Sequence, residues 1–245
     1  MWADQAERVS DRYTCVRYDR RGHTRSARGS TPVSTAVHAD DAAALIEALE
    51  LAPCLLVSSS GGAVIGVDVA MRHGHLLRGA VFSEPPLFSL DAQGRDAATA
   101  DLGPIVGQAA SGDLRSVVDA FFSLMCPGLW SRIDESRKDS YRANAEIGFA
   151  DVRSQALQVT PDELAAVSVP ALVIAGDASH PALRSIARRL AAGLADARFI
   201  EMADCGHVTY AEQPEAFAGV VSTFAAELDG RVALATGQVQ SGAAR

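Results

Sequence analysis

A run of small polar residues, Ser58-Ser59-Ser60-Gly61-Gly62, closes an apolar stretch of this chain. A serine with small residues two positions before and two positions after it is typical of a sharp turn from a strand into a helix, because small residues let the two backbones approach closely. In this frame Ser60 lies at the apex, and Ser58 stands where the pattern usually has its first glycine. The chemistry that such a turn allows is nucleophilic attack by the Ser60 hydroxyl.

Strands and helices alternate around this turn. Apolar runs predict strands at 14–18, 54–59, 77–83, 171–175 and 198–202. Apolar spacing and capping residues predict helices at 3–12, 31–50, 61–73 and 181–193, and a last helix from Pro214. Apolar strands that alternate with helices indicate a parallel sheet covered on both faces. The predicted fold class is therefore α/β, and the serine turn joins a strand to the helix that covers it.

The alternation stops after the strand at 77–83. Residues 87–168 predict only helical stretches, and apolar side chains are concentrated there: Phe88, Phe121, Phe122, Leu124, Met125, Trp130, Tyr141 and Phe149. A block of this size between two sheet strands is expected to form a helical cap inserted into the core. The predicted organisation is a core of residues 1–86 and 169–228, a cap of residues 87–168 and a mobile tail of residues 229–245.

Composition limits the possible partners. The chain has 245 residues, of which 48% are hydrophobic and 21% are charged, as in an ordinary globular domain. Its net charge of −8 argues against nucleic acid and against a basic membrane-binding face. The start of the sequence has no signal-peptide pattern, and the four cysteines have no metal-ligand spacing. We expect a cytoplasmic protein without metal or cofactor; its oligomeric state stays open.

Four pieces of the chain carry a family resemblance. They are YDRRGHTRS (18–26), LLVSSSGG (55–62), VPALVIAGD (169–177) and DCGHVTYAEQPEAF (204–217). Each lies at the end of a predicted strand or the start of a predicted helix, and together they resemble the α/β-hydrolase family, specifically its small capped bacterial members. The resemblance covers roughly residues 2–228 and implies an α/β-hydrolase fold, a mostly parallel sheet flanked by helices.

The resemblance also implies roles for three residues. A serine hydroxyl is a weak nucleophile at neutral pH, so it needs an adjacent base, and the base needs a third group that fixes its tautomer. By its place between the last strand and the last helix, His207 is expected to be that base for Ser60. The backbone N–H of Gly61, the residue after the nucleophile, is expected to donate to the oxyanion.

The third group has two candidates. Relatives usually carry a carboxylate after the strand at 171–175, but this chain has Ser179 at that place. Glu84 and Asp177 both keep the chain order serine, acid, histidine. We favour Glu84, because it follows an apolar strand and is expected to be partly buried, whereas Asp177 is suited to cap the next helix.

The front of the chain departs from the family pattern. The resemblance implies a second oxyanion donor from a loop that follows a central strand, and Met1-Trp2 resembles the beginning of the helix after that loop. Two interpretations remain open: the natural product starts upstream of Met1, or the shortened chain is catalytically impaired. We favour the first.

Two functions follow as hypotheses. The first is a serine hydrolase that acts on a small, largely hydrophobic ester, lactone or thioester through an acyl-enzyme on Ser60. The second is a catalytically impaired relative that binds a small molecule under its cap. A serine nucleophile argues against haloalkane dehalogenase and epoxide hydrolase chemistry, which in this family uses a carboxylate nucleophile.

Overall fold

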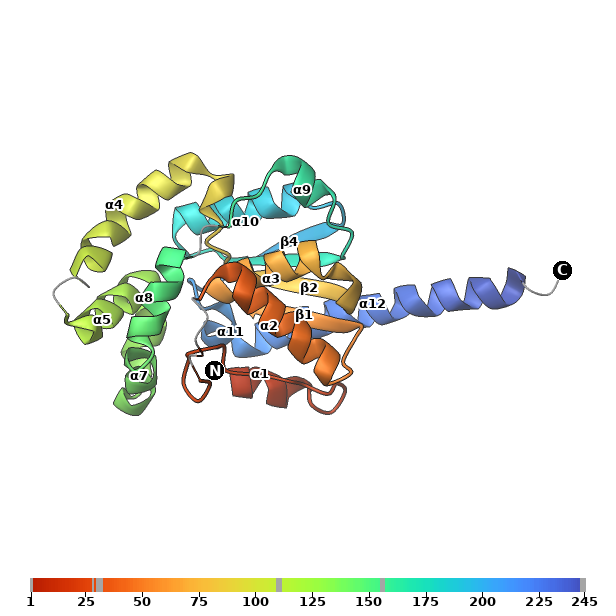
Figure 1. Ribbon diagram of the computed structural model, residues 1–245, viewed down its shortest axis with the longest axis horizontal. Helices are drawn as coiled ribbons and strands as arrows, with labels where there is room; N and C mark the ends of the chain where they lie inside the picture. Colours follow the sequence, from red (N-terminus) through yellow and green to blue (C-terminus); the bar gives the residue numbers. More distant parts are fainter. Residues whose placement is uncertain (1, 28, 30–32, 109–111, 155–156, 243–245) are drawn as a thin grey trace.

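Four parallel strands form the sheet at the centre of the molecule (Figure 1). The computed structural model of the chain describes residues 2–27, 29, 33–108, 112–154 and 157–242. The strands follow one another across the sheet in chain order: β1 Cys54–Ser59, β2 Leu77–Ser83, β3 Ala171–Gly176 and β4 Ala197–Met202. Each neighbouring pair is parallel, so the carboxyl ends of all four strands meet at one edge of the sheet.

Helices precede, connect and follow these strands. Those of the first half are α1 Trp2–Val9, α2 Thr35–Ala48, α3 Gly61–Arg72 and the 3-10 turns Gly74–Leu76 and Phe88–Leu90. Between β2 and β3 lie α4 Ala92–Gln108, α5 Leu114–Met125, α6 Pro127–Arg132, α7 Glu135–Arg142, α8 Ala145–Ser154 and α9 Pro161–Ala165. The last are α10 Pro181–Gly193, α11 Thr209–Glu212 and α12 Pro214–Gly242. The predicted alternation is therefore confirmed from β1 onward. The helix predicted from residue 31 begins instead at Thr35, with Ser34 as its N-cap, and the predicted cap at 31–32 lies outside the described residues.

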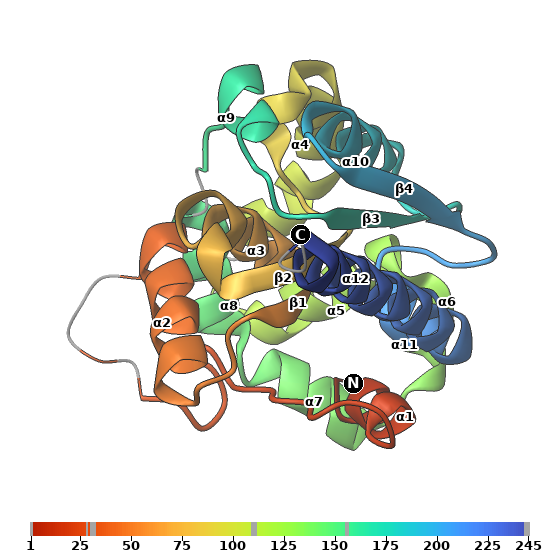
Figure 2. The ribbon, with the colours of Figure 1, turned by 90° about the vertical axis from the view of Figure 1, so that its right-hand side faces the viewer.

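The two faces of the sheet carry separate apolar cores. Successive side chains of a strand point to opposite faces, so Phe82 of β2 packs with Val64 of α3 and Ile186 of α10. Its neighbour Val81 packs with Phe217 of α12 on the other face. In Figure 2 the sheet lies between α10 and α12. Burial on both faces explains why the strands are apolar along most of their length.

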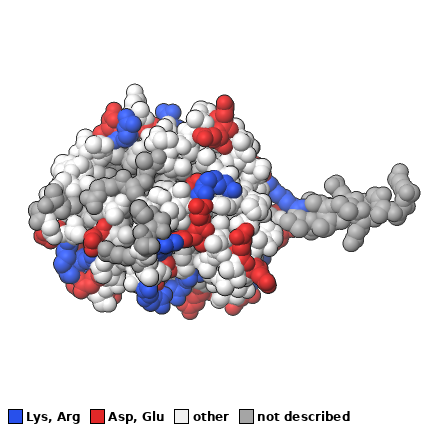
Figure 3. All heavy atoms as spheres, in the orientation of Figure 1, with Lys and Arg blue, Asp and Glu red and all other residues white. Residues whose placement is uncertain are grey.

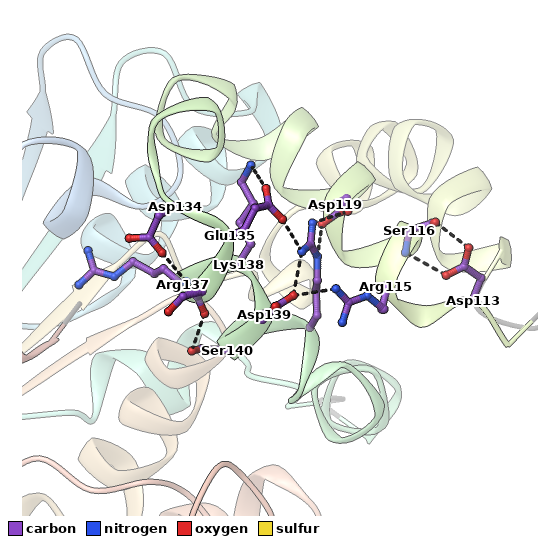
Figure 4. Close-up of polar contacts among 12 residues, drawn as sticks. Asp113, Arg115, Ser116, Asp119, Asp134, Glu135, Arg137, Lys138, Asp139 and Ser140 are labelled. Atoms are coloured by element: carbon purple, nitrogen blue, oxygen red, sulfur yellow. Dashed lines mark hydrogen bonds and ion pairs between the residues drawn. The ribbon is translucent and has the colours of Figure 1, made fainter.

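Side-chain contacts join the helices between β2 and β3. The guanidinium of Arg142 on α7 bonds Asp119 of α5 at 2.8 Å and also pairs with Glu135 and Asp139 of its own helix. Figure 4 shows this charged network between α5 and α7. Aromatic packing adds to it, because Phe122 of α5 stacks on Trp130 of α6 with ring centroids 4.7 Å apart.

The prediction of a strand at 14–18 is wrong. These residues have no regular secondary structure, and Val16 and Tyr18 are 47% and 44% exposed. A strand is held by backbone bonds to a neighbouring strand, and β1 is an edge strand of the sheet that the described residues form. Residues 14–18 are paired with no strand of this sheet, so their apolar alternation does not produce a strand.

The last helix is longer than its apolar pattern predicts. The periodic face ends near Leu228, but α12 continues to Gly242 and extends beyond the sheet (Figure 1). The sequence after Asp229 contains strong helix formers such as alanine, leucine and glutamine, and propensity alone allows the backbone to continue. The predicted mobility of this end stays a prediction.

The charged side chains of the surface are mixed in sign. Figure 3 shows basic and acidic side chains interspersed on the face of Figure 1. Across the described part of the chain, no helix combines the length and the apolar character needed to cross a bilayer.

Candidate active site

Ser60 lies at the turn between β1 and α3, where the sequence predicts it. Its backbone angles are φ 54° and ψ −131°, an unusual conformation for a residue with a side chain. Two backbone bonds hold the turn: Ser60 N–H donates to Ser83 O at 2.9 Å, and Ala63 N–H donates to Ser60 O at 2.8 Å. The turn therefore presents the Ser60 side chain at the carboxyl edge of the sheet.

The substitution of serine for the first glycine of the pattern has a structural explanation. Ser58 is buried, and its hydroxyl donates to the Val81 carbonyl of β2 at 2.9 Å. The helix makes room for it at Gly66, where a Cβ would lie 2.5 Å from the Ser58 oxygen. A glycine one turn into α3 thus permits the close strand–helix approach that the missing glycine usually provides.

His207 is buried and reaches Ser60 from the loop after β4. Its Nε2 lies 2.9 Å from the Ser60 Oγ, a hydrogen-bond distance. The loop is held by Glu212, whose carboxylate accepts the N–H groups of Gly206 and Val208, on either side of the histidine, at 3.0 Å each. These bonds fix the backbone that carries the imidazole.

Glu84 completes the chain of contacts. It follows β2, is fully buried, and places Oε2 3.2 Å from His207 Nδ1. This contact assigns the Nδ1 hydrogen to the Glu84 side and leaves Nε2 free to accept the Ser60 hydroxyl proton. Asp177, the other carboxylate that the sequence left open, is exposed and does not contact His207.

Two further groups hold the Glu84 carboxylate. The N–H of Gly176 donates to Oε1 at 2.8 Å, and the Ser179 hydroxyl donates to Oε2 at 2.5 Å. Gly176 is also where β3 passes closest to the loop that carries His207. A Cβ at this position would lie 2.1 Å from the Cys205 carbonyl oxygen. Only glycine permits this approach.

Gly61, the predicted oxyanion donor, is the first residue of α3. The first N–H groups of a helix have no acceptor within the helix, and the helix dipole favours negative charge beside them. The Gly61 N–H therefore belongs to a part of the backbone that can donate to an anion next to Ser60.

Two buried thiols lie beside this arrangement. Cys126 follows Met125, whose carbonyl accepts the His207 N–H at 3.3 Å, and Cys205 lies two residues before His207. Burial raises the pKa of each thiol to about 12. Because the thiolate is the reactive form, both side chains stay unreactive at neutral pH. Within the described residues, no group of histidine, cysteine and acidic side chains could hold a metal ion.

Sequence reasoning identified Ser60, His207 and Glu84 and missed the groups that position them. The sequence places Glu212 five residues after His207, in the EQPEAF segment, but no spacing rule marks it as a loop support. In the sequence, Ser179 is marked only by its place, where relatives usually carry a carboxylate. Ser179 lies in the turn after β3 and contacts Glu84, and Glu212 contacts the loop after β4. The sequence alone does not indicate that these residues are in contact.

Comparison with known proteins shows the family of this chain. The profile of the alpha/beta hydrolase family matches residues 1–220. The hydrolase YraK of Bacillus subtilis (strain 168), whose function is described as uncharacterized, is 38% identical over 87 residues, which are 35% of this chain and 32% of that protein. RutD of Caulobacter sp. (strain K31) is 28% identical over 236 residues, covering 91% of this chain and 84% of that protein.

A solved structure extends the likeness to the whole fold. The enol-lactonase of Burkholderia xenovorans LB400 superposes with a TM-score of 0.75 at 23% identity, covering 92% of this chain and 85% of that one. At this identity the likeness shows the fold alone. The family match spans most of the chain, from α1 into α12. The chain has the α/β-hydrolase fold and belongs to the alpha/beta hydrolase family.

Proposed function

We propose that this protein is a serine hydrolase in which Ser60 is the nucleophile, His207 the general base and acid, and Glu84 the orienting carboxylate. The observation that carries the proposal is the unbroken chain of contacts from Ser60 Oγ through the imidazole to Glu84, at 2.9 Å and 3.2 Å. Family membership and the hydrolase description of YraK support the reaction class.

The reaction follows from these contacts. His207 Nε2 takes the Ser60 hydroxyl proton while the Ser60 oxygen attacks the substrate carbonyl carbon, and the carbonyl oxygen becomes an oxyanion. The Gly61 N–H donates to that oxyanion. When the tetrahedral intermediate collapses, His207 gives its proton to the leaving alcohol or thiol, and the acyl group stays on Ser60.

Water completes the cycle by the same groups. His207 removes a proton from a water molecule that attacks the acyl carbonyl, and then returns a proton to Ser60 as the acid product leaves. Glu84 holds Nδ1 and stabilises the positive charge of the imidazolium in both halves. The Glu84 carboxylate is not exposed to solvent, so water does not screen its attraction to the imidazolium.

The helices between β2 and β3 favour a small, largely hydrophobic molecule as the substrate of this site. We infer that residues 87–168 form a cap over the site, because Met125 at the end of α5 bonds the His207 backbone and Asn144 bonds the N–H of Thr24 at 2.8 Å. An apolar cluster that includes Phe122, Trp130 and Val118 forms a small core within this segment. An ester, lactone or thioester with a compact apolar acyl group matches that chemistry.

A fluorophosphonate probe tests the proposal, because it phosphonylates only an activated serine. We expect the chain to be labelled, Ser60→Ala to abolish labelling, and Ser59→Ala, the adjacent control, to retain it. Mass spectrometry of the labelled peptide identifies the modified residue. A folded chain that resists the probe contradicts the proposal and favours the second hypothesis, a small-molecule binding protein.

A further inference from the structure

We propose that Ser179 is a positioning residue for Glu84, one that holds the carboxylate oxygen facing His207. The inference rests on the proposed function, since it concerns the orienting acid of that site. Its basis is a single shared atom: Glu84 Oε2 accepts the Ser179 hydroxyl at 2.5 Å and faces His207 Nδ1 at 3.2 Å. Ser179 itself is buried, with 5% of its surface exposed.

The geometry explains why a second anchor is needed. The terminal torsion of a glutamate side chain is broad, so one hydrogen bond leaves the carboxylate free to swing. The Gly176 N–H holds Oε1, and the Ser179 hydroxyl holds Oε2. Two donors on different oxygens fix the plane of the carboxylate, and that plane determines where the remaining lone pair of Oε2 points.

The hydroxyl is not needed to form the turn in which it lies. Backbone bonds already hold residues 176–179: Asp177 N–H donates to Met202 O at 2.9 Å, Ala178 N–H donates to Cys205 O at 3.0 Å, and Ser179 N–H donates to Gly176 O at 3.2 Å. Removing the hydroxyl therefore leaves the turn in place. Its loss acts mainly on Glu84, and through Glu84 on His207.

Two kinetic consequences follow for Ser179→Ala. A carboxylate with one anchor misorients the imidazole, so we expect kcat to fall by about 10- to 100-fold with KM little changed. The same loss changes the position of the Glu84 charge that His207 faces. We therefore expect the acidic limb of the kcat/KM profile to differ from that of wild type.

The other titratable groups near His207 stay the same in this comparison. Glu212 bonds the backbone on both sides of the histidine, and the Cys205 thiol, with its pKa raised to about 12, stays protonated. Asp177 and Asp204 are exposed to solvent near the same loop. A shift of the acidic limb between wild type and Ser179→Ala therefore reports the lost hydroxyl.

Ser185→Ala is the matched control. Ser185 on α10 makes the same kind of contact, donating to Asp91 at 2.5 Å, but neither residue touches Ser60, His207 or Glu84. Ser179→Thr keeps a hydroxyl and tests rescue. We expect Ser185→Ala to keep the wild-type kcat and pH profile, and Ser179→Thr to recover most of the activity that Ser179→Ala loses.

Hydrolysis of p-nitrophenyl butyrate and the proton NMR signal of His207 Nδ1–H are the two measurements. The far-downfield Nδ1–H signal reports the bond to Glu84 whether or not the protein turns over substrate. We expect it to shift or broaden in Ser179→Ala and not in Ser185→Ala. If the signal, kcat and pH profile of Ser179→Ala all match wild type, the inference is wrong, whereas a wild type that neither hydrolyses esters nor reacts with fluorophosphonate contradicts the proposed function instead.

Discussion

At the residue scale, the two ends of the proposed triad lie in unusual backbone conformations. Ser60 has φ 54° and Glu84 has φ 55°, and both carry side chains. Such conformations cost on the order of 1–3 kcal/mol each and persist only where the surrounding structure holds them. Here Ser60 N–H bonds β2 through Ser83 O, and Glu84 N–H bonds β3 through Ile174 O at 2.9 Å. Strain at both positions directs the side chains toward His207.

Substitution of each acidic residue by its amide distinguishes Glu84 from Asp177, the two candidates that the sequence leaves open. Glu84→Gln keeps the size of the side chain but loses the charge that stabilises the imidazolium, so we expect kcat to fall by about 10⁴-fold. Asp177→Asn, on an exposed side chain without contact to His207, is expected to change kcat less than about twofold. Steady-state hydrolysis by both variants checks this, and the reverse order of effects would overturn the assignment of Glu84.

Stability measurements test the strain at Ser60. Glycine adopts positive φ without a side-chain penalty, so Ser60→Gly is expected to be more stable than Ser60→Ala by about 1–2 kcal/mol. Both variants lose the nucleophile, which removes activity as a variable. Urea unfolding of the two proteins measures the difference. Equal stability would mean that the turn relaxes to negative φ when the serine is removed.

At the element scale, the site depends on close packing between α3 and the two strands beneath it. Gly66 of α3 faces Ser58 of β1 and Phe82 of β2, and a Cβ there would lie 2.5 Å and 3.3 Å from their nearest side-chain atoms. Gly62, four residues earlier in the same helix, has open space around its Cβ position. Gly66 therefore permits the close contact between α3 and the strands, whereas nothing packs against the Cβ position of Gly62.

These two glycines provide a matched pair of substitutions. We expect Gly66→Ala to destabilise the fold by about 1–3 kcal/mol, because the new methyl group pushes α3 away from β1. Gly62→Ala is expected to be neutral or to stabilise the fold by up to about 1 kcal/mol, since alanine is the better helix former. Denaturant unfolding measures both, and a neutral Gly66→Ala would show that Ser58 can move aside.

Asp91 joins the helices α4 and α10 in a pH-dependent way. The Ser185 hydroxyl and the Gly94 N–H hold the pKa of its carboxyl below the ordinary value. A depressed folded-state pKa contributes stability above the unfolded value near 3.9, and that stability is lost as the pH falls further through the folded value.

Asp91→Asn is therefore expected to lose about 1 kcal/mol of unfolding free energy at pH 6. The deficit relative to wild type should shrink as the pH falls below about 4, because the unfolded wild-type chain then takes up a proton that the folded carboxyl, with its lower pKa, does not yet bind. Asp96→Asn, an exposed neighbour on α4, serves as the control and should change stability little at either pH. Urea titrations at both pH values check the pattern, and a deficit that persists unchanged at pH 3 would contradict it.

At the scale of the whole molecule, the four cysteine thiols differ in how deeply they are buried. Cys15 is exposed and Cys54 is half-buried, whereas Cys126 and Cys205 are buried in the core shared by β3, α6 and α12. This core includes the loop that carries His207. Reaction of its two thiols therefore requires the opening of the same region that holds the site together.

Alkylation with iodoacetamide tests this arrangement. In the native protein at pH 8 we expect Cys15 to react first and Cys126 and Cys205 to stay unmodified, because burial raises the pKa of both thiols to about 12. In urea all four should react at similar rates. Peptide mass spectrometry follows each site, and rapid native labelling of Cys205 would show that the His207 loop opens locally.

The sequence by itself determined the four sheet strands, most clearly β2 and β3, because strands that are buried on both faces must be apolar. It also marked two candidates: Ser60 by its turn chemistry, and His207 by the family resemblance, which places a base between the last strand and the last helix. Only the tertiary structure shows that Glu84, and not the exposed Asp177, contacts His207, since this contact joins residues 123 positions apart.

Tertiary structure alone also decided the conformation of 14–18 and the hydrogen-bond partner of Ser179. A strand needs a neighbour, and the apolar pattern of 14–18 carries no information about whether one lies beside it. A serine side chain is equally compatible with solvent, a helix cap or a buried carboxylate, and its partner Glu84 is 95 positions away. Periodicity is a local property of the chain, whereas hydrogen-bond partners across the sheet edge depend on how β2, β3 and the last loop come together in space.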